Sequence, residues 1–223
     1  MKTVAIGIIG YGTVGQGVVE VLARNAREIE RRSGYQLQVK RVAKRSWQGI
    51  DTSALPFTCD TDPFVIASDP DIGIVIELAG GEHPAFEIIT TALEHDKHVI
   101  TANKALIARH GDALFALARE KGLELTFEAA VAGGIPVIKI LREGMSGNEV
   151  KRVAGIINGT SNYILSEMAQ KGRNFADVLK EAQALGYAEA DPSFDINGTD
   201  AAHKITILAS LAFGIPLQFD SVT

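Results

Sequence analysis

The sequence predicts an α/β protein with a doubly wound parallel sheet, followed by a second, smaller α+β domain. Two observations support this fold class. Short apolar runs alternate with amphipathic helical segments through residue 132, and a glycine-rich turn separates the first run from the first helix. Alternation of this kind builds βαβ units with parallel strands and right-handed crossovers. Near Gly133 the alternation of strands and helices ends, and mainly helical segments follow. We therefore expect one domain over residues 1–132 and another over residues 133–223.

The individual elements follow from two periodicities. Short runs rich in β-branched residues predict buried strands, and apolar residues at helical spacing, such as Phe86, Ile89 and Leu93, predict helices. In the first domain the expected strands are Val4–Ile9, Leu37–Ala43, Ile72–Leu78, His98–Thr101 and Glu124–Phe127, and the expected helices are Val14–Arg31, Pro84–His95 and Ala105–Lys121. In the second domain we expect a helix to Glu143, a strand over Glu149–Ile157, and helices over Ser161–Gln170, Phe175–Leu185 and Asp200–Ala212.

The composition is that of an ordinary globular protein and excludes several functional classes. Hydrophobic residues make up 46% of the 223 and charged residues 22%, and the net charge is −5. A negative chain is not a general binder of nucleic acids or membrane surfaces. The apolar N-terminus is too short for a secretory signal, and no run reaches the roughly 20 apolar residues of a membrane span. With Cys59 as the only cysteine and its histidines scattered, the sequence predicts a cytoplasmic protein without a disulfide or catalytic zinc.

A glycine-rich turn stands between the first expected strand and the first expected helix. The residues Gly10-Tyr11-Gly12-Thr13-Val14-Gly15 match the pattern G-x-G-x-x-G. In a Rossmann-type fold the first glycine permits the tight turn, the second lets the backbone approach a pyrophosphate, and the third lets helix and strand pack closely. The helix N-terminus adds N–H groups and a positive dipole. We therefore expect a dinucleotide to bind at Gly10, Gly12, Thr13, Val14 and Gly15.

The end of the second strand bears on which dinucleotide binds. NAD enzymes usually place an acidic residue there for the ribose 2′-hydroxyl. This strand instead ends in Lys44 and Arg45, whose charges suit a 2′-phosphate. NADP is therefore favoured over NAD, although adjacent basic residues are often simply solvated.

Two further segments are unusually polar. Thr101-Ala102-Asn103-Lys104 lies at the carboxyl end of a strand, which is the edge where ligands bind in open α/β sheets. Residues 186–204, GYAEADPSFDINGTDAAHK, gather four carboxylates before an expected helix. Asp200 and Lys204 are four residues apart on that helix, a spacing that places them within ion-pairing reach. A lysine at the edge of so apolar a helix is a candidate for catalysis, and the alternative is an ordinary surface pair.

Residues 186–204 resemble the signature of homoserine dehydrogenases. The likeness rests on Ala182, Gly186-Tyr187, Asp191-Pro192, Asp195-Ile196, Gly198, Asp200 and Lys204 at the spacing of that family. Four other stretches are similar to the same family: the glycine turn, residues 101–104, residues 127–136 and residues 155–163. The resemblance therefore covers essentially the whole chain.

The resemblance implies roles for the matching positions. Lys204 would exchange the proton at the substrate oxygen, with Lys104 near the reacting centre and the nicotinamide. The implied substrate-binding residues are Glu189, Asp200, Asp195, Thr160 and Tyr187, and the further cofactor contacts are Asn103, Lys104, Gly186 and Glu189. A monovalent cation, sodium or potassium, would be held mainly by backbone oxygens of Glu128, Val131, Gly133 and Ile135.

The implied activity is the NAD(P)-dependent interconversion of L-homoserine and L-aspartate 4-semialdehyde. It is an oxidoreduction at a CH–OH group that serves threonine, methionine and isoleucine biosynthesis. The family's full-length form is expected to be a homodimer or tetramer and to extend past the residue matching Thr223, so we expect this chain to be truncated at its C-terminus. Two alternatives stay open. One is another Rossmann dehydrogenase acting through a thiol, for which Cys59 is poorly placed, and the other is a catalytically silent NAD(P)-binding module.

Overall fold

The computed structural model describes residues 2–223 and divides them into two compact units. The first unit ends at Gly134, and the second runs from Ile135 to Thr223. No helix within residues 2–223 is long and apolar enough to cross a membrane.

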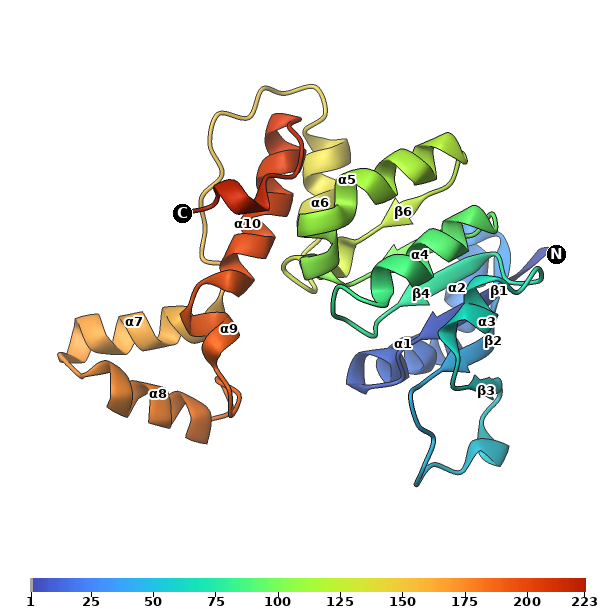
Figure 1. Ribbon diagram of the computed structural model, residues 1–223, viewed down its shortest axis with the longest axis horizontal. Helices are drawn as coiled ribbons and strands as arrows, with labels where there is room; N and C mark the ends of the chain where they lie inside the picture. Colours follow the sequence, from blue (N-terminus) through green and yellow to red (C-terminus); the bar gives the residue numbers. More distant parts are fainter. Residues whose placement is uncertain (1) are drawn as a thin grey trace. The chain divides into compact units, whose positions relative to one another are not determined.

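The first unit is built on a sheet of six parallel strands (Figure 1). The strands are β1 (Lys2–Ile9), β2 (Tyr35–Ala43), β3 (Thr58–Asp60), β4 (Ile74–Glu77), β5 (His98–Thr101) and β6 (Leu125–Thr126). Their order in the sheet is β3-β2-β1-β4-β5-β6. The chain winds outward from β1 in one direction and then in the other, with the reversal between β1 and β4, which is the order of a dinucleotide-binding sheet. The predicted Rossmann-type, doubly wound parallel sheet is confirmed.

Helices cover both faces of this sheet. They are α1 (Thr13–Arg24), α2 (Ala26–Ser33), α3 (Pro63–Ala67), α4 (Ala85–Glu94) and α5 (Lys104–Glu120), with 3₁₀ turns η1 (Thr52–Ala54) and η2 (Glu128–Ala130). Ile6 and Ile8 belong to a core cluster that also takes in side chains of α1, whereas a Cβ on Gly7 would lie 2.2 Å from the Ile66 side chain of α3. Successive strand residues face opposite sides of a sheet, so α1 and α3 lie on opposite faces. Gly7 therefore lets α3 approach the sheet closely.

The structure differs from the predicted elements of this unit in two places. The single helix expected over Val14–Arg31 is two helices, separated at Asn25, whose φ of −102° and ψ of 14° leave the helical range. β3 and α3 were not expected, because each has five residues or fewer and shows too little periodicity. A local signal for α3 does exist: Asp62 accepts a hydrogen bond from the N–H of Phe64, and Pro63 stands at the first helical position.

The second unit consists of helices and the segments that join them. These are α6 (Val137–Lys139), a π-helical turn η3 (Ile140–Gly144), α7 (Gly159–Lys171), α8 (Phe175–Ala184), α9 (Ser193–Ile196), α10 (Thr199–Phe213) and the 3₁₀ turn η4 (Phe219–Ser221). The helices α7 and α8 pack against each other around a small core of Ile164, Val178, Ala182 and Ala188.

The strand predicted over Glu149–Ile157 is wrong for this chain. Residues 149–157 take part in no strand, and the part of the second unit that the structure describes contains helices alone. A β-strand is stable only when its N–H and C=O groups pair with a neighbouring strand. The β-branched residues of this segment favour a strand, but no strand is available to pair with it among residues 135–223.

Candidate functional site

The glycine turn joins β1 to α1 at the edge where the strand order reverses. Gly10 has a φ of +105°, which favours glycine, and its N–H donates to the carbonyl of Ala43 at 2.9 Å. A Cβ on Gly10 would lie 2.6 Å from the carbonyl carbon of Leu78. The turn is therefore packed directly between the ends of β2 and β4.

The other two glycines of the turn have different roles. A Cβ on Gly15 would lie 2.1 Å from the carbonyl oxygen of Gly10, so this glycine lets α1 pack tightly on the turn. Around Gly12, in contrast, no described residue other than its neighbours along the chain comes within 4 Å of an added Cβ. Gly12 begins α1 without a side-chain cap or an acidic residue in the first turn, and Val14 in that turn is exposed. This open helix N-terminus fits a pyrophosphate group.

The basic pair after β2 lies beside an aromatic cluster. Arg45 is exposed, and the Nζ of Lys44 stands 6.0 Å from the ring centre of Trp47, which packs with Tyr11. The carboxylate of Asp60, which lies at the end of β3 opposite Ala43, is already held by Arg41 through bonds of 2.9 and 2.8 Å. A ribose 2′-substituent at this edge would therefore meet positive charge.

The end of β5 leads into α5 through Asn103 and Lys104. Asn103 caps α5, because its Oδ1 accepts the N–H of Leu106 at 3.1 Å, and it is almost fully buried. Its Nδ2 donates to the carbonyl of Gly81 at 2.5 Å. Lys104 is the first residue of α5 and is partly buried. The loops after β4 and β5 are thus tied together next to Lys104.

In the second unit a lysine, two carboxylates and an amide form one hydrogen-bonded group. The Nζ of Lys204 donates to Asp200 Oδ2 at 2.6 Å and to the carbonyl of Ile157 at 2.7 Å. Asn158 Nδ2 donates to Asp200 Oδ2 and to Asp195 Oδ1, each at 2.8 Å. An ammonium group has three N–H donors, and these two described bonds use two of them, which leaves the third for a ligand oxygen. We call Lys204, Asp200, Asn158 and Asp195 the lysine–carboxylate network.

Four further residues predicted for the site lie in the loop between α8 and α9 or contact it. Thr160 is buried at the start of α7 and donates to the carbonyl of Tyr187 at 2.6 Å, which fixes the loop. The Tyr187 ring is exposed and packs on Tyr163 at 5.0 Å. Glu189 is exposed, and among the described contacts its carboxylate does not join the network. Gly186 adopts a φ of +77° that favours glycine.

The residues implied for a monovalent cation follow β6. Glu128 begins the 3₁₀ turn η2, Val131 is fully buried, and Ala132 has a φ of +52°. The carbonyl of Ile135, the first residue of the second unit, accepts the N–H of Val137 at 2.8 Å. No group of three or more His, Cys, Asp or Glu side chains suited to a metal occurs among the described residues. Gly133 lies in the same segment.

Sequence reasoning missed two residues of these sites. Asn158 is the amide of the lysine–carboxylate network, and Glu77 is a fully buried carboxylate at the end of β4. Asn158 also caps α7, since its Oδ1 accepts the N–H of Ser161. An asparagine before a helix predicts this capping role from sequence, but it does not predict contact with Asp195 and Asp200. For Glu77 the signal was a charge inside an otherwise apolar strand.

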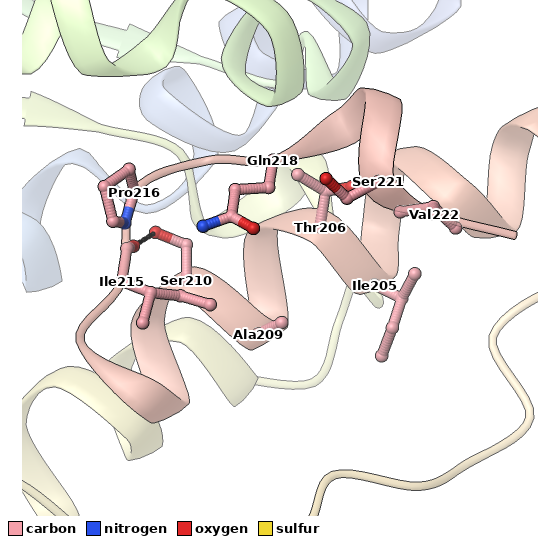
Figure 2. A pocket seen from close by; sticks show the side chains of 9 residues that line it. All are labelled: Ile205, Thr206, Ala209, Ser210, Ile215, Pro216, Gln218, Ser221 and Val222. Carbon is pink, nitrogen blue, oxygen red and sulfur yellow. Dashed lines mark hydrogen bonds between the residues drawn. The ribbon is translucent and has the colours of Figure 1, made fainter.

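A pocket of about 160 Å³ in the second unit is separate from these residues. It lies between α10 and the segment that follows it, where the Ser210 hydroxyl donates to the carbonyl of Ile215 at 2.6 Å (Figure 2). Its lining contains none of the predicted site residues.

Comparisons with known proteins agree on one family. A family model described as homoserine dehydrogenase, NAD binding domain, matches residues 10–128, and a homoserine dehydrogenase model matches residues 136–223. The chain is similar to the homoserine dehydrogenase of Pseudomonas aeruginosa, with 61% identity over 99% of this chain and 50% of that protein. It is 52% identical to the enzyme of that name from Neisseria gonorrhoeae, over 99% of this chain and 51% of that protein.

Solved structures give the same result. The structure of a homoserine dehydrogenase from Thiobacillus denitrificans matches with a TM-score of 0.93 and 56% identity, over 99% of this chain and 51% of that one. A hyperthermophilic archaeal homoserine dehydrogenase in complex with NADPH matches with a TM-score of 0.84 and 30% identity, over 96% of this chain and 71% of that one. The chain spans about half the length of the curated relatives it matches. By both family models and by these structures, the chain belongs to the homoserine dehydrogenase family.

Proposed function

We propose that this chain catalyses the NAD(P)-dependent interconversion of L-homoserine and L-aspartate 4-semialdehyde. The lysine–carboxylate network is the observation that carries the proposal, because it pairs a proton donor with carboxylates in the unit that matches the homoserine dehydrogenase model. The first unit is proposed to bind the dinucleotide, and the second to bind the substrate. The reaction would supply homoserine for threonine, methionine and isoleucine biosynthesis.

The proposed chemistry assigns a task to each group of the network. A bound nicotinamide dinucleotide would supply or accept the hydride. Lys204 would move the proton at the substrate oxygen, since one of its N–H groups is not used by Asp200 or Ile157. Asp200 and Asp195 would attract the substrate ammonium group, together with Glu189 from the neighbouring loop. Lys104 would assist at the reacting centre.

For the cofactor we propose NADP in preference to NAD. The support is the basic pair Lys44 and Arg45 after β2, together with the engagement of Asp60 by Arg41. The archaeal relative bound to NADPH shows that a member of this family accepts that cofactor. Replacing both Lys44 and Arg45 by alanine should weaken NADPH binding much more than NADH binding. Equal losses for the two cofactors would contradict a role in 2′-phosphate recognition.

Two further features are proposed from the family. A sodium or potassium ion would be held mainly by backbone oxygens of Glu128, Val131, Gly133 and Ile135, and the full-length protein would be a homodimer or tetramer. Turnover measured in sodium, potassium and a large organic cation tests the first feature. Size-exclusion chromatography with light scattering tests the second.

The deciding experiment is homoserine-dependent reduction of NADP and NAD by this chain. We expect turnover with L-homoserine and little with L-serine or other amino alcohols, and a higher kcat/KM with NADP. Cofactor binding without turnover would contradict catalysis by this chain, and turnover with many alcohols would contradict the substrate assignment.

A further inference from the structure

Glu77 is a fully buried carboxylate at the carboxyl end of β4, next to the central strand of the sheet. Its Oε1 accepts the backbone N–H groups of Ala79 at 2.8 Å and Gly80 at 3.0 Å. Its Oε2 accepts the hydroxyl of Thr101, the last residue of β5, at 2.6 Å. One side chain thus holds the loop after β4 and reaches across to the end of the neighbouring strand.

The chain of contacts continues into the loop after β5. The Thr101 oxygen accepts the N–H of Asn103 at 3.0 Å, and Asn103 in turn donates to the carbonyl of Gly81. Glu77, Thr101 and Asn103 therefore close a ring of hydrogen bonds that joins residues 79–81 to residues 101–103. All three residues are at least nine-tenths buried. A buried polar ring of this kind costs free energy when any member loses its partner, so it specifies one arrangement of the two loops.

This ring of hydrogen bonds lies at the carboxyl edge of the sheet, where a dinucleotide would bind. In a doubly wound sheet a dinucleotide lies across the carboxyl edge, one nucleotide on each half of the sheet. The glycine turn and the basic pair belong to the half made of β1, β2 and β3, which leaves the half made of β4, β5 and β6 for the nicotinamide nucleotide. Glu77 stands at the start of that second half, and its ring ends beside Lys104.

We propose that Glu77 is a positioning residue for the nicotinamide half of the cofactor site. It sets the loops after β4 and β5, acting through Thr101 and Asn103. This role depends on the proposed function only in requiring that the chain bind a dinucleotide, and it needs no homoserine turnover.

The experiment measures two ligands separately on wild type and variants. NADPH, followed by the fluorescence of its reduced ring, probes the whole site. Adenosine 2′,5′-bisphosphate, followed by the fluorescence of Trp47, the only tryptophan, probes the adenine half beside Lys44. The variants are Glu77→Gln, which presents an N–H where Thr101 needs an acceptor, and Thr101→Val, which removes the bridging hydroxyl. Thr101→Ser restores that hydroxyl.

We expect Glu77→Gln and Thr101→Val each to weaken NADPH binding by about tenfold, the effect of one lost buried hydrogen bond to a charged group. Binding of adenosine 2′,5′-bisphosphate should change by less than about twofold, and Thr101→Ser should bind both ligands like wild type.

Lys97→Met is the stability control, because it removes a buried amine at the opposite end of β5. It should lower the melting temperature without changing the ratio of the two affinities.

Two results would overturn the proposal. One is NADPH binding by Glu77→Gln and Thr101→Val that is as tight as in wild type. The other is a proportional loss of both ligands, as expected of general destabilisation. A wild-type chain that binds NADPH but does not oxidise homoserine would contradict the proposed activity and leave this test intact.

Discussion

Asp200 and Lys204 lie one turn apart on α10, and 2.6 Å separates the carboxylate oxygen from the ammonium nitrogen. The Asp200 side chain is 7% exposed and that of Lys204 is 19% exposed, so the pair is largely shielded from solvent. An exposed pair at this spacing contributes only a few tenths of a kcal/mol, but a shielded charge depends on its partner. This pair holds the lysine in a fixed position.

Replacing Lys204 by alanine should abolish most of the homoserine turnover. General acid–base groups contribute about 10²- to 10⁴-fold to rate, and the variant should lose kcat by a factor in that range. NADPH affinity should be unchanged, because the glycine turn belongs to the other unit. Lys204→Arg, which keeps the ion pair but gives up protons far less readily, is the control and should also be slow. If Lys204→Ala kept more than about a tenth of the wild-type kcat, that result would contradict the role of Lys204 in proton transfer.

Replacing Asn158 by aspartate should weaken homoserine binding without unfolding α7. Aspartate keeps the oxygen that caps α7 but replaces the amide donor with a third carboxylate beside Asp195 and Asp200. We expect KM for homoserine to rise at least about tenfold, because the two aspartates lose their shared donor. The matched control is Asn174→Asp at the cap of α8, which makes the same chemical change away from the network. A similar KM in both variants would contradict a role for Asn158 in aligning the carboxylates.

Alanine substitutions at Gly15 and Gly12 should have different effects, the first on stability and the second on cofactor binding. An alanine at Gly15 would push its Cβ into the carbonyl of Gly10, and overpacking of this kind costs about 1–3 kcal/mol. An alanine at Gly12 meets no described neighbour, so the fold should keep its melting temperature while the methyl group blocks approach of the pyrophosphate. Thermal unfolding and NADPH titration of the two variants check this. Full NADPH affinity in Gly12→Ala would contradict pyrophosphate binding at this turn.

Asp69 should make the first unit sensitive to acid. Burial alone would raise the pKa of this carboxyl, but hydrogen bonds from the N–H of Asp71 and the ammonium of Lys40 outweigh it and hold the pKa below its ordinary value. The contribution of the Asp69 carboxylate to the free energy of unfolding is therefore fully present above its unfolded pKa of about 3.9. It is lost as the pH falls through the lower pKa of the folded state.

Urea unfolding between about pH 5 and pH 2 tests this dependence, since acid-labile pairs lose their contribution there. Asp69→Asn should lower the free energy of unfolding at neutral pH and flatten its fall in acid. The same change at Asp71, the exposed second partner of Lys40, should leave the slope close to that of wild type. An unchanged slope in Asp69→Asn would show that other carboxyls control the acid transition.

Much of the first unit is predictable because its signals are local. The segments that became β1, β2, β4 and β5 each place buried residues in the sheet, and the glycine turn stands where a strand meets a helix. The short elements β3 and α3 escape prediction because their stability comes from packing on β2 and β1 rather than from their own pattern. The strand predicted over residues 149–157 is wrong for a different reason. Its pattern suits a strand, but strand formation depends on a partner that no local signal reports.

The candidate site shows the same division. Asp200 and Lys204 are predictable as a pair because helix geometry fixes residues four apart. Asn158 meets Asp195 and Asp200 across 37 and 42 residues of sequence, and only the packing of α9 against both α7 and α10 brings them together. Glu77 and Thr101 meet because β4 and β5 pair in register, with Glu77 opposite Thr101.

The central place of β1 has a consequence for how the chain is made. Ile6 pairs with Val39 of β2 on one side and with Ile74 of β4 on the other. Since a ribosome releases the chain from its N-terminus, a nascent chain can complete the first pairing well before the second. Until β4 has emerged, one side of the first strand presents unpaired N–H and C=O groups, which are a template for another chain. Synthesis is therefore the stage at which this sheet is most exposed to aggregation.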